Sequence, residues 1–356
     1  MNISFILIFL CVAVLALSGI KRKKSVPVDG ADCLSLANTK AIKGIMALLI
    51  LLHHLSQQSF VALPKVFAPL GYIGFIVVAT FFFFSGYGLM YNLEHKKDYL
   101  KTFFPKRFLS IYVPFWIVTA ICIVVYAILG QPFTWWECLL GFLGARTVTG
   151  CWFVTTILIF YVLFFVSFSL CEKWKLGHTA PIVMVSAGLL VYCLILYFLD
   201  EHSSQTASVF AFVFGLTYSK FANKLTAWLK QRYVIKLLLS AVAFAVLYVG
   251  RIGLDYIGIQ HELLHMFLRN VVSIAFVFML ICILHGIDFH NKVLLWFADI
   301  SYAVYIVHSV LMAMLGFSLM KKPEIYVLIM VFGTIISSFV ITVASNFIFK
   351  NLNKRA

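Results

Sequence analysis

Long apolar runs alternate with short polar segments along the whole chain. Runs of roughly 18 or more apolar residues are long enough to cross a hydrocarbon core about 30 Å thick as helices. Eleven such runs lie at residues 3–20, 43–61, 70–92, 108–129, 151–170, 180–199, 206–222, 234–250, 269–287, 296–318 and 325–348. The pattern predicts an all-α, polytopic transmembrane helical bundle with one extra amino-terminal helix and a core of about ten spans.

The polar segments between these runs contain no internal repeat and no Gly/Ser-rich linker that would divide the chain. We therefore expect an amino-terminal anchor helix and basic connector at 1–33, one membrane domain at 34–350 and a short cytoplasmic tail at 351–356. The first run is followed by the basic sequence KRKK, whereas a cleaved signal peptide has its positive charge before the apolar run. This order favours a retained anchor helix.

Composition supports the membrane class. The chain is 63% hydrophobic and 12% charged, whereas about 25% of the residues in a soluble domain are charged. A net charge of +15 could indicate nucleic-acid binding, but the basic residues are distributed by loop instead of gathering on one soluble face. We therefore expect membrane lipids, and no nucleic acid, as partners.

The distribution of Lys and Arg predicts the orientation of the chain. If the loops alternate between the two sides of the membrane, most of the 28 basic residues fall on one side. The other side holds only Lys65, Arg146, Arg251, Arg269, Lys321 and Lys322. The positive-inside rule places the richer side in the cytoplasm. We expect a multi-pass protein of the cell membrane with its amino terminus outside and its carboxyl terminus in the cytoplasm.

The segment KAIKGIMALLILLHHLS, residues 40–56, carries ionisable side chains inside an apolar helix. Such residues are costly at membrane depth and are by default functional candidates. Lys43 and His54 are eleven residues apart, so they lie on one helix face, separated by roughly 16 Å along the axis. His53 points about 100° away around the helix. The alternative is an interfacial Lys43 that snorkels to water beside histidines that are satisfied in the core.

Ser301, Tyr305 and His308 form a second polar stripe, because steps of four and three residues return to nearly the same helix face. This stripe either lines a polar cavity that faces His54 or forms a hydrogen-bonded seam between helices. Asp299 is either a partner that orients a histidine or an interfacial residue.

The sequence HELLH at 261–265 matches the HExxH pattern of zinc peptidases. A catalytic zinc site also needs a third protein ligand, and no recognisable third-ligand motif follows. We therefore expect no metal, and a membrane metallopeptidase is a lesser alternative.

Several stretches together resemble acyltransferase family 3, whose members are membrane proteins that O-acylate cell-surface glycans and other acceptors. Lys43, ten further residues and His54 resemble the family's first-helix motif. The other stretches are FFFFSGYGLM (81–90), FFPKRFLSIYVP (103–114), CWFVTTILIFY (151–161) and LLWFADISYAVYIVH (294–308). The resemblance covers about residues 34–350.

Two departures from the family pattern concern charge. The family usually has arginine where this chain has Lys43, and lysine keeps the charge but not the bidentate fork. The family also usually repeats arginine three residues after the position of Arg107, where this chain has Ser110. Lys106 is then the expected substitute contact.

The resemblance implies an O-acyltransferase that moves an acyl group, typically acetyl, from cytoplasmic acyl-CoA to a hydroxyl of a cell-surface carbohydrate or related acceptor. His54 suits a general base, because an imidazole with a pKa of about 6.5 accepts and returns a proton near neutral pH. We expect no tightly bound cofactor. The expected site comprises the catalytic residues His54, Lys43 and His308, the donor-binding residues Lys106 and Arg107, and the lining residues Ser301, Tyr305 and Trp152. Trp152 could equally be an interface anchor. The main alternative function is a transporter or flippase of glycans or lipid-linked intermediates.

Overall fold

The computed structural model describes residues 2–24, 33–144, 150, 152–177, 179–199 and 204–353. These residues form twelve α-helices, three short 3₁₀ helices and two three-residue strands. The α-helices are α1 (Ile3–Leu17), α3 (Leu36–Ser56), α4 (Gly74–His95), α5 (Phe103–Ile128), α6 (Trp135–Leu143), α7 (Trp152–Lys173), α8 (Ala180–Phe198), α9 (Phe210–Lys230), α10 (Tyr233–Tyr256), α11 (Glu262–Gly286), α12 (Lys292–Leu319) and α13 (Pro323–Asn353). The 3₁₀ helices are η1 (Ser59–Val61), η2 (Lys65–Tyr72) and η3 (Tyr99–Thr102), and the strands are β1 (Ile20–Arg22) and β2 (Ile287–Phe289).

The predicted helical membrane bundle is confirmed. Each of the eleven apolar runs lies on a helix, and nine helices of the described chain are long and apolar enough to cross a membrane. Of the other two runs, the first forms the 15-residue α1, and the run at 206–222 lies on α9, which continues into a more polar second half. The chain is therefore a multi-pass membrane protein.

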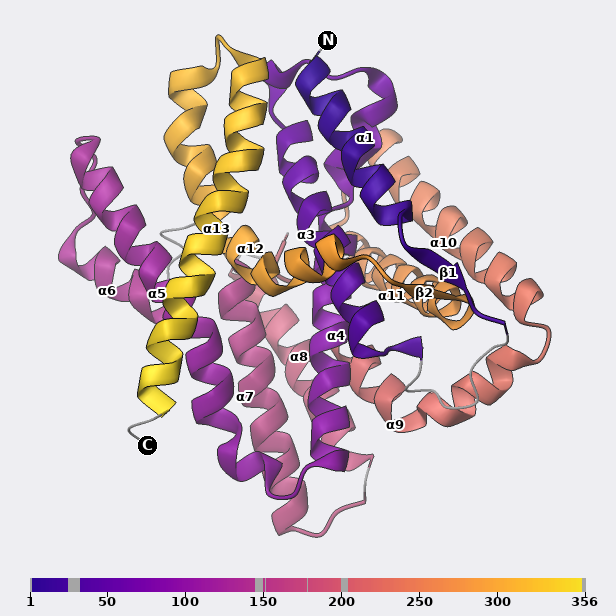
Figure 1. Cartoon of the computed structure of the whole chain (residues 1–356). Coiled ribbons are helices and arrows are strands. Elements are labelled where there is room, and N and C mark those ends of the chain that lie inside the picture. Colours follow the sequence, from indigo (N-terminus) through magenta and orange to yellow (C-terminus); the bar gives the residue numbers. More distant parts are fainter. Residues whose placement is uncertain are drawn as a thin grey trace.

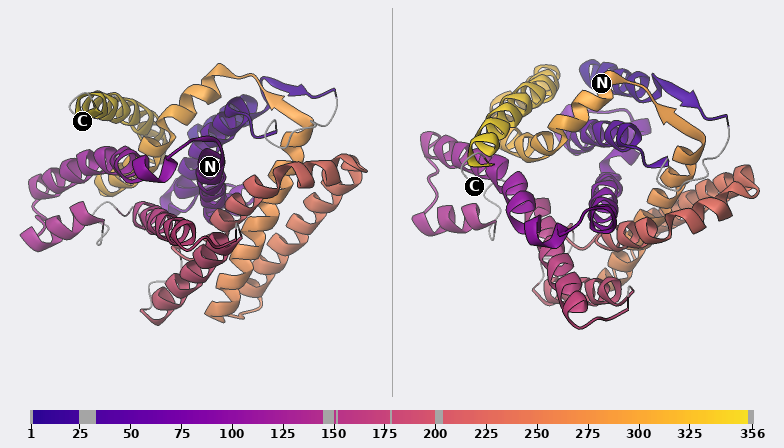
Figure 2. Two further views of the ribbon diagram at one scale, coloured as in Figure 1. Left: turned by 90° about the horizontal axis from the view of Figure 1, so that it is seen from below. Right: turned by 60° about the horizontal axis from the view of Figure 1, so that its bottom comes forward.

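Helices α3 and α4 lie in the middle of the bundle, with α5, α7, α9, α11 and α12 around them (Figures 1 and 2). Most residues in the apolar windows of α3 and α4 are buried, whereas only 6% of those in α10 are buried. An exposed apolar helix surface is expected where lipid tails are the solvent. The functional candidates on α3 are thus at the centre of the bundle.

The tightest helix crossing joins α4 to α9 at two glycines. A Cβ atom on Gly86 would lie 2.1 Å from the carbonyl oxygen of Phe212, and one on Gly215 would lie 2.2 Å from that of Phe83. Small residues permit this approach of backbones, which supplies van der Waals contact between helices in a membrane. The crossing holds α4, one wall of the candidate site, firmly in place.

The amino-terminal helix α1 lies against α13. Both helices begin together, because the backbone N–H groups of Ile3 and Ser4 each donate a hydrogen bond of 2.7 Å to the Glu324 carboxylate. Beyond α1, strand β1 pairs antiparallel with β2, in the register Lys21 to Asp288. This small ribbon connects the anchor helix to the core.

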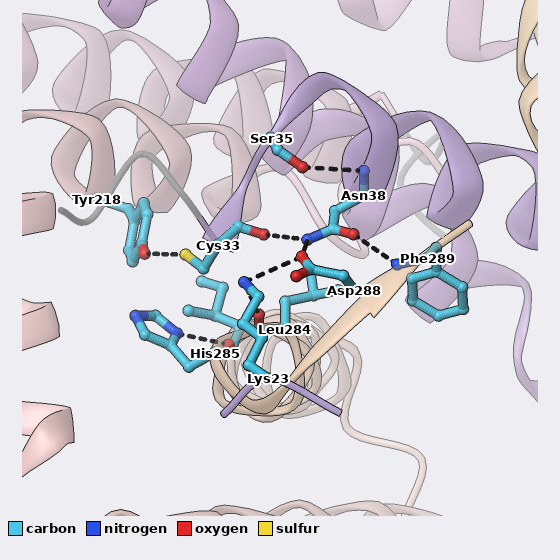
Figure 3. Close-up of polar contacts among 10 residues, drawn as sticks. Lys23, Cys33, Ser35, Asn38, Tyr218, Leu284, His285, Asp288 and Phe289 are labelled. Atoms are coloured by element: carbon cyan, nitrogen blue, oxygen red, sulfur yellow. Dashed lines mark hydrogen bonds and ion pairs between the residues drawn. The ribbon is translucent and has the colours of Figure 1, made fainter. Parts of the chain in front are cut away.

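A buried polar network attaches the start of α3 to β2 (Figure 3). The Asn38 side chain donates to Asp288 Oδ1 at 2.8 Å and accepts from the Phe289 backbone N–H at 2.9 Å. Lys23 forms an ion pair of 3.2 Å with the same Asp288 oxygen. Ser35 accepts a hydrogen bond from the Asn38 backbone N–H and caps the helix. The first turn of α3 is therefore fixed by a segment 250 residues away in sequence.

Several expectations fall wholly or partly outside the described residues. Among the residues that are not described are 25–32 of the connector expected within 1–33, and Cys151 of the stretch 151–161. Arg146, which the charge argument placed on the less basic side, is one of these residues. Of the tail expected at 351–356, residues 351–353 continue α13, and the last three lie outside the described chain.

Candidate active site

A large cavity opens beside the first half of α3. Its volume is about 690 Å³, within the range of small-molecule sites. Helices α3, α4, α5, α7 and α12 all contribute to its wall. We call it the large cavity, and its wall includes Lys43, Ile50, Val78, Phe81, Phe84, Ser85, Tyr87, Arg107, Phe153, Tyr161, Ser301 and Tyr305.

Two cations line the large cavity. Lys43 Nζ lies 5.7 Å from the centre of the Phe84 ring, a cation–π distance. Arg107 donates to the Tyr99 hydroxyl from Nε at 3.3 Å and from Nη2 at 3.2 Å. Among the described residues no carboxylate forms an ion pair with either cation. This end of the cavity can therefore receive an anionic ligand.

A second, smaller cavity lies at the carboxyl end of α3. Its volume is about 330 Å³. We call it the histidine cavity, and its wall includes Ile50, His53, His54, Gln57, Tyr72, Phe75, Val78, Trp152, Arg251, Arg269 and Tyr305. Three of these residues, Ile50, Val78 and Tyr305, also line the large cavity. The two cavities therefore meet at one shared wall.

His54 is held in a defined orientation and tautomer. Gln57 donates from Nε2 to the Gly71 carbonyl at 3.1 Å, so its Oε1 faces His54 Nδ1 at 3.3 Å. An amide oxygen only accepts hydrogen bonds, and Nδ1 must therefore carry the proton. In the neutral ring, Nε2 then has its lone pair free to accept a proton.

His308 and His53 flank His54 on two sides. The His308 ring stacks on the His54 ring with centroids 4.8 Å apart, and its Nδ1 donates to the Val304 carbonyl at 3.1 Å. His53 lies 4.7 Å from His54, ring to ring, and donates from Nδ1 to the Leu70 carbonyl at 2.8 Å. His308 itself lines neither cavity and reaches the site through its ring contacts with His54 and Tyr305.

The polar stripe on α12 also reaches the cavities. Ser301 lines the large cavity and donates to the Ala298 carbonyl at 2.8 Å. Tyr305 lines both cavities and lies 5.7 Å from His308, ring to ring. Asp299 forms an ion pair of 2.5 Å with Lys40. The question left open by the sequence is thereby answered: Asp299 pairs with a lysine of α3 rather than with a histidine.

The remaining predicted residues divide into two groups. Trp152 lines the histidine cavity, and Arg107 lines the large cavity. Lys106, the expected substitute for the missing second arginine, is exposed and lines neither cavity. Ser110, which stands in place of that arginine, does line the large cavity. The structure thus assembles seven of the eight predicted residues at the cavities or in contact with His54.

Sequence reasoning did not find Arg251, Arg269 or Gln57. The two arginines were counted only as charges of the less basic side, and no local pattern joins α10 and α11 to α3. Gln57 had a usable signal, because residues three apart on a helix are neighbours and Gln57 follows His54 by three. All three side chains line the histidine cavity.

The HELLH segment has a different geometry from a zinc site. His265 donates from Nε2 to the Ile259 carbonyl at 2.7 Å, and His261 precedes the first turn of α11 in an extended conformation. Within the described chain, no group of three His, Cys, Asp or Glu side chains is placed to hold a metal ion. These observations give the metallopeptidase alternative no support.

Comparison with known proteins gives the family. No curated protein and no solved structure matches the chain. The profile of the family described as "Acyltransferase domain" matches residues 37–343. This range contains α3 from its second residue, the whole wall of the histidine cavity, and the wall of the large cavity except residues 34–36. A match over most of the chain identifies the protein as an acyltransferase enzyme. The chain therefore belongs to acyltransferase family 3, as its Lys43–His54 helix and the four further stretches predicted.

Proposed function

We propose that the protein is an O-acyltransferase that transfers an acetyl or other acyl group from acyl-CoA in the large cavity to a hydroxyl group in the histidine cavity. One observation carries the proposal. The two cavities share the wall formed by Ile50, Val78 and Tyr305, and His54 lies on the histidine side of that wall. A donor and an acceptor that entered from opposite ends would meet beside a single imidazole.

The large cavity suits a donor with an anionic end and an acyl end. Lys43 and Arg107 supply positive charge for phosphate groups, and charge-assisted hydrogen bonds to phosphate are among the strongest in proteins. Lys106, exposed next to Arg107, adds charge at the same end. The aromatic wall leads from these cations toward Tyr305, so the acyl-bearing arm would extend along it to the shared wall.

The chemistry assigned to His54 is general-base catalysis. His54 Nε2 accepts the proton of the acceptor hydroxyl as the oxygen attacks the thioester carbonyl carbon. The new C–O bond forms, the C–S bond breaks, and the proton passes from the imidazolium to the departing CoA thiolate. Such positioned proton transfer typically contributes about 10²–10⁴-fold to the rate.

The neighbouring residues support this step in different ways. The stacked His308 ring holds His54 against the shared wall, and Gln57 keeps its Nε2 unprotonated before the reaction. Tyr305 and Ser301 place hydroxyl groups along the path of the acyl group. Trp152 offers an aromatic face to the acceptor, which suits the apolar face of a sugar ring.

The proposed orientation follows from the charges. The large cavity lies at the end of α3 that also carries Lys40 and Lys43, and the positive-inside rule assigns such an end to the cytoplasm. Acyl-CoA would then enter from the cytoplasm, and the histidine cavity would face outward. The acceptor would be a carbohydrate of the cell surface or a related hydroxyl compound, modified at the cell membrane.

The test measures transfer directly. Cells that produce the protein should show a higher O-acetyl content in their surface carbohydrate, and their membranes should move labelled acetyl from acetyl-CoA to that material. His54→Ala should abolish both signals while the protein still inserts into the membrane. His290→Ala is the matched control, because it removes an exposed imidazole that lines neither cavity. Wild-type turnover by His54→Ala would disprove the assignment.

A further inference from the structure

Arg251 is a buried charge in the wall of the histidine cavity. It projects from α10, and only 6% of its side chain is exposed. An arginine buried at this depth is costly unless its donors are paired. Any donor of this guanidinium group that has no partner in the protein therefore indicates which kind of ligand the cavity binds.

Only part of the Arg251 guanidinium group is paired within the described residues. Nη2 donates to Asp255 Oδ2 at 2.9 Å, and the group lies 5.9 Å from the centre of the Phe75 ring, which also lines the cavity. Nε is buried and has no hydrogen-bond partner among the described residues. One donor of the guanidinium group is thus left without a partner, in a side chain that lines the cavity.

The other arginine in the wall of the histidine cavity adds a second positive charge. Arg269, on α11, lines it as well. Among the described residues, no aspartate or glutamate lines the histidine cavity, and Asp255 contacts Arg251 from outside the wall. A cavity with two arginines and no lining carboxylate favours an anionic occupant.

We infer that the acceptor carries an anionic group, a carboxylate or a phosphate, which Arg251 binds while the reacting hydroxyl lies at His54. The inference rests on the proposed function, because it assigns the substrate class of the same site. A guanidinium fork matches the geometry of both anions. At about 330 Å³, the cavity has room for one small unit that bears both the hydroxyl and the charge.

An anionic group on the acceptor would also give selectivity. A neutral acceptor would leave Arg251 Nε buried without a partner, and sites with unpaired buried polar groups reject such ligands strongly. The cavity reaches the surface near Tyr72, whose side chain is 49% exposed. A charged acceptor can therefore enter without crossing the apolar core of the bundle.

The test measures binding to the purified full-length protein without any donor. Titration calorimetry compares two matched pairs of probes: glucuronate with glucose, and sn-glycerol 3-phosphate with glycerol. Wild type should bind at least one anion about tenfold more tightly than its neutral counterpart, and the pair that shows the preference identifies carboxylate or phosphate. Arg251→Gln should remove that preference, and Arg251→Lys should retain part of it.

Two further variants separate anion binding from a structural role. Asp255→Asn breaks the ion pair but keeps the guanidinium group, so anion binding should be equal to or tighter than that of wild type. Lys321→Gln removes an exposed charge outside the cavity and should leave the preference unchanged. If Asp255→Asn and Arg251→Gln both lose binding, Arg251 serves only the ion pair and the inference is overturned.

Failure of the inference and failure of the proposed function give different results. Equal binding of charged and neutral probes by wild type overturns the anionic acceptor, even if acetyl transfer to a neutral sugar is then measured. A clear anion preference that Arg251→Gln removes supports the anionic site. If such a protein also transfers no acetyl group, the proposed reaction is the part that is wrong.

Discussion

The two cavities share a wall and differ in almost everything else. The large cavity has a mainly apolar wall, with eight aromatic residues among the 24 that line it and two cations, Lys43 and Arg107. The histidine cavity is half its size, and its polar lining includes imidazole, amide, indole and guanidinium groups. An apolar passage suits a flexible arm that must slide, and a small polar chamber suits a group that must be oriented. The difference agrees with the proposed function, in which donor binding and chemistry belong to opposite halves of one helix.

The helical period explains how α3 serves both cavities. Lys43, Ile50 and His54 follow each other by seven and four residues, which keeps them on one face of the helix. Lys43 lines the large cavity, Ile50 lines both, and His54 lines the histidine cavity. One straight stripe therefore crosses the shared wall, and substitutions along it should separate donor effects from acceptor effects.

The largest effect after the loss of His54 is expected at the donor end. Lys43→Gln removes one of the two cations of the large cavity and should raise the KM for acetyl-CoA about tenfold, the loss of one charge-assisted contact. Lys43→Arg should restore or improve donor binding, since it adds a fork. Steady-state kinetics with varied acetyl-CoA measure both.

Lys40→Gln is the control for this experiment, because Lys40 pairs with Asp299 and does not line the cavity. It should change the donor KM little. If Lys43→Gln instead raises the KM for the acceptor and leaves the donor KM unchanged, the proposed division of roles between the two cavities is wrong.

A smaller effect is expected at the chemical end. Gln57→Leu removes the acceptor for His54 Nδ1–H, so the ring can adopt the tautomer whose Nε2 is protonated. The value of kcat should fall several-fold while the donor KM stays constant, because the ring remains stacked on His308. Gln57→Glu keeps an acceptor at Nδ1 and should lose less activity than Gln57→Leu.

Measurement of kcat and KM across a pH series checks this interpretation. If Gln57 fixes the tautomer, the leucine variant should show a changed pH profile of kcat. An unchanged profile with a raised acceptor KM would show that Gln57 only contacts the acceptor.

The fold and the axis of the site could be predicted from sequence because both depend on local periodicity. Apolar runs of membrane length locate the helices, and the 3.6-residue repeat places Lys43 and His54 on one face. Likewise, Ser301, Tyr305 and His308 follow from steps of four and three residues. Each of these inferences needs only residues within one helix.

The other parts of the site depend on contacts between distant helices. Arg251 reaches the histidine cavity because α10 packs on α11, which in turn packs on α4, and no pattern within α10 indicates this. Lys106 and Arg107 are adjacent in sequence, yet a rotation of 100° per residue around the helix leaves Lys106 exposed. The β1–β2 ribbon pairs two three-residue segments more than 260 residues apart, far too short for a sequence pattern to predict.

The smallest effect is expected at the network that fixes the first turn of α3, next to residues 34–36 of the large cavity wall (Figure 3). Asn38 is fully buried and bonds to Cys33, Asp288 and Phe289. Asn38→Ala removes these three hydrogen bonds and should lower the free energy of unfolding by about 1–3 kcal/mol.

Loss of these bonds should also let the first turn of α3 shift at the rim of the large cavity. We therefore expect Asn38→Ala to raise the donor KM two- to threefold, while probe binding in the histidine cavity stays unchanged.

Asp288→Asn is the matched variant, since it removes only the charge of an ion pair whose carboxylate is 36% exposed. Such pairs contribute about 1 kcal/mol or less, and the new amide still offers an oxygen to Asn38. In detergent, Asn38→Ala should therefore unfold at a clearly lower temperature than Asp288→Asn. Its KM for the donor should also be higher. Equal losses would mean that the ion pair with Lys23, not the buried amide, holds α3 in place. A change in the histidine cavity would mean that the two halves of α3 are not independent.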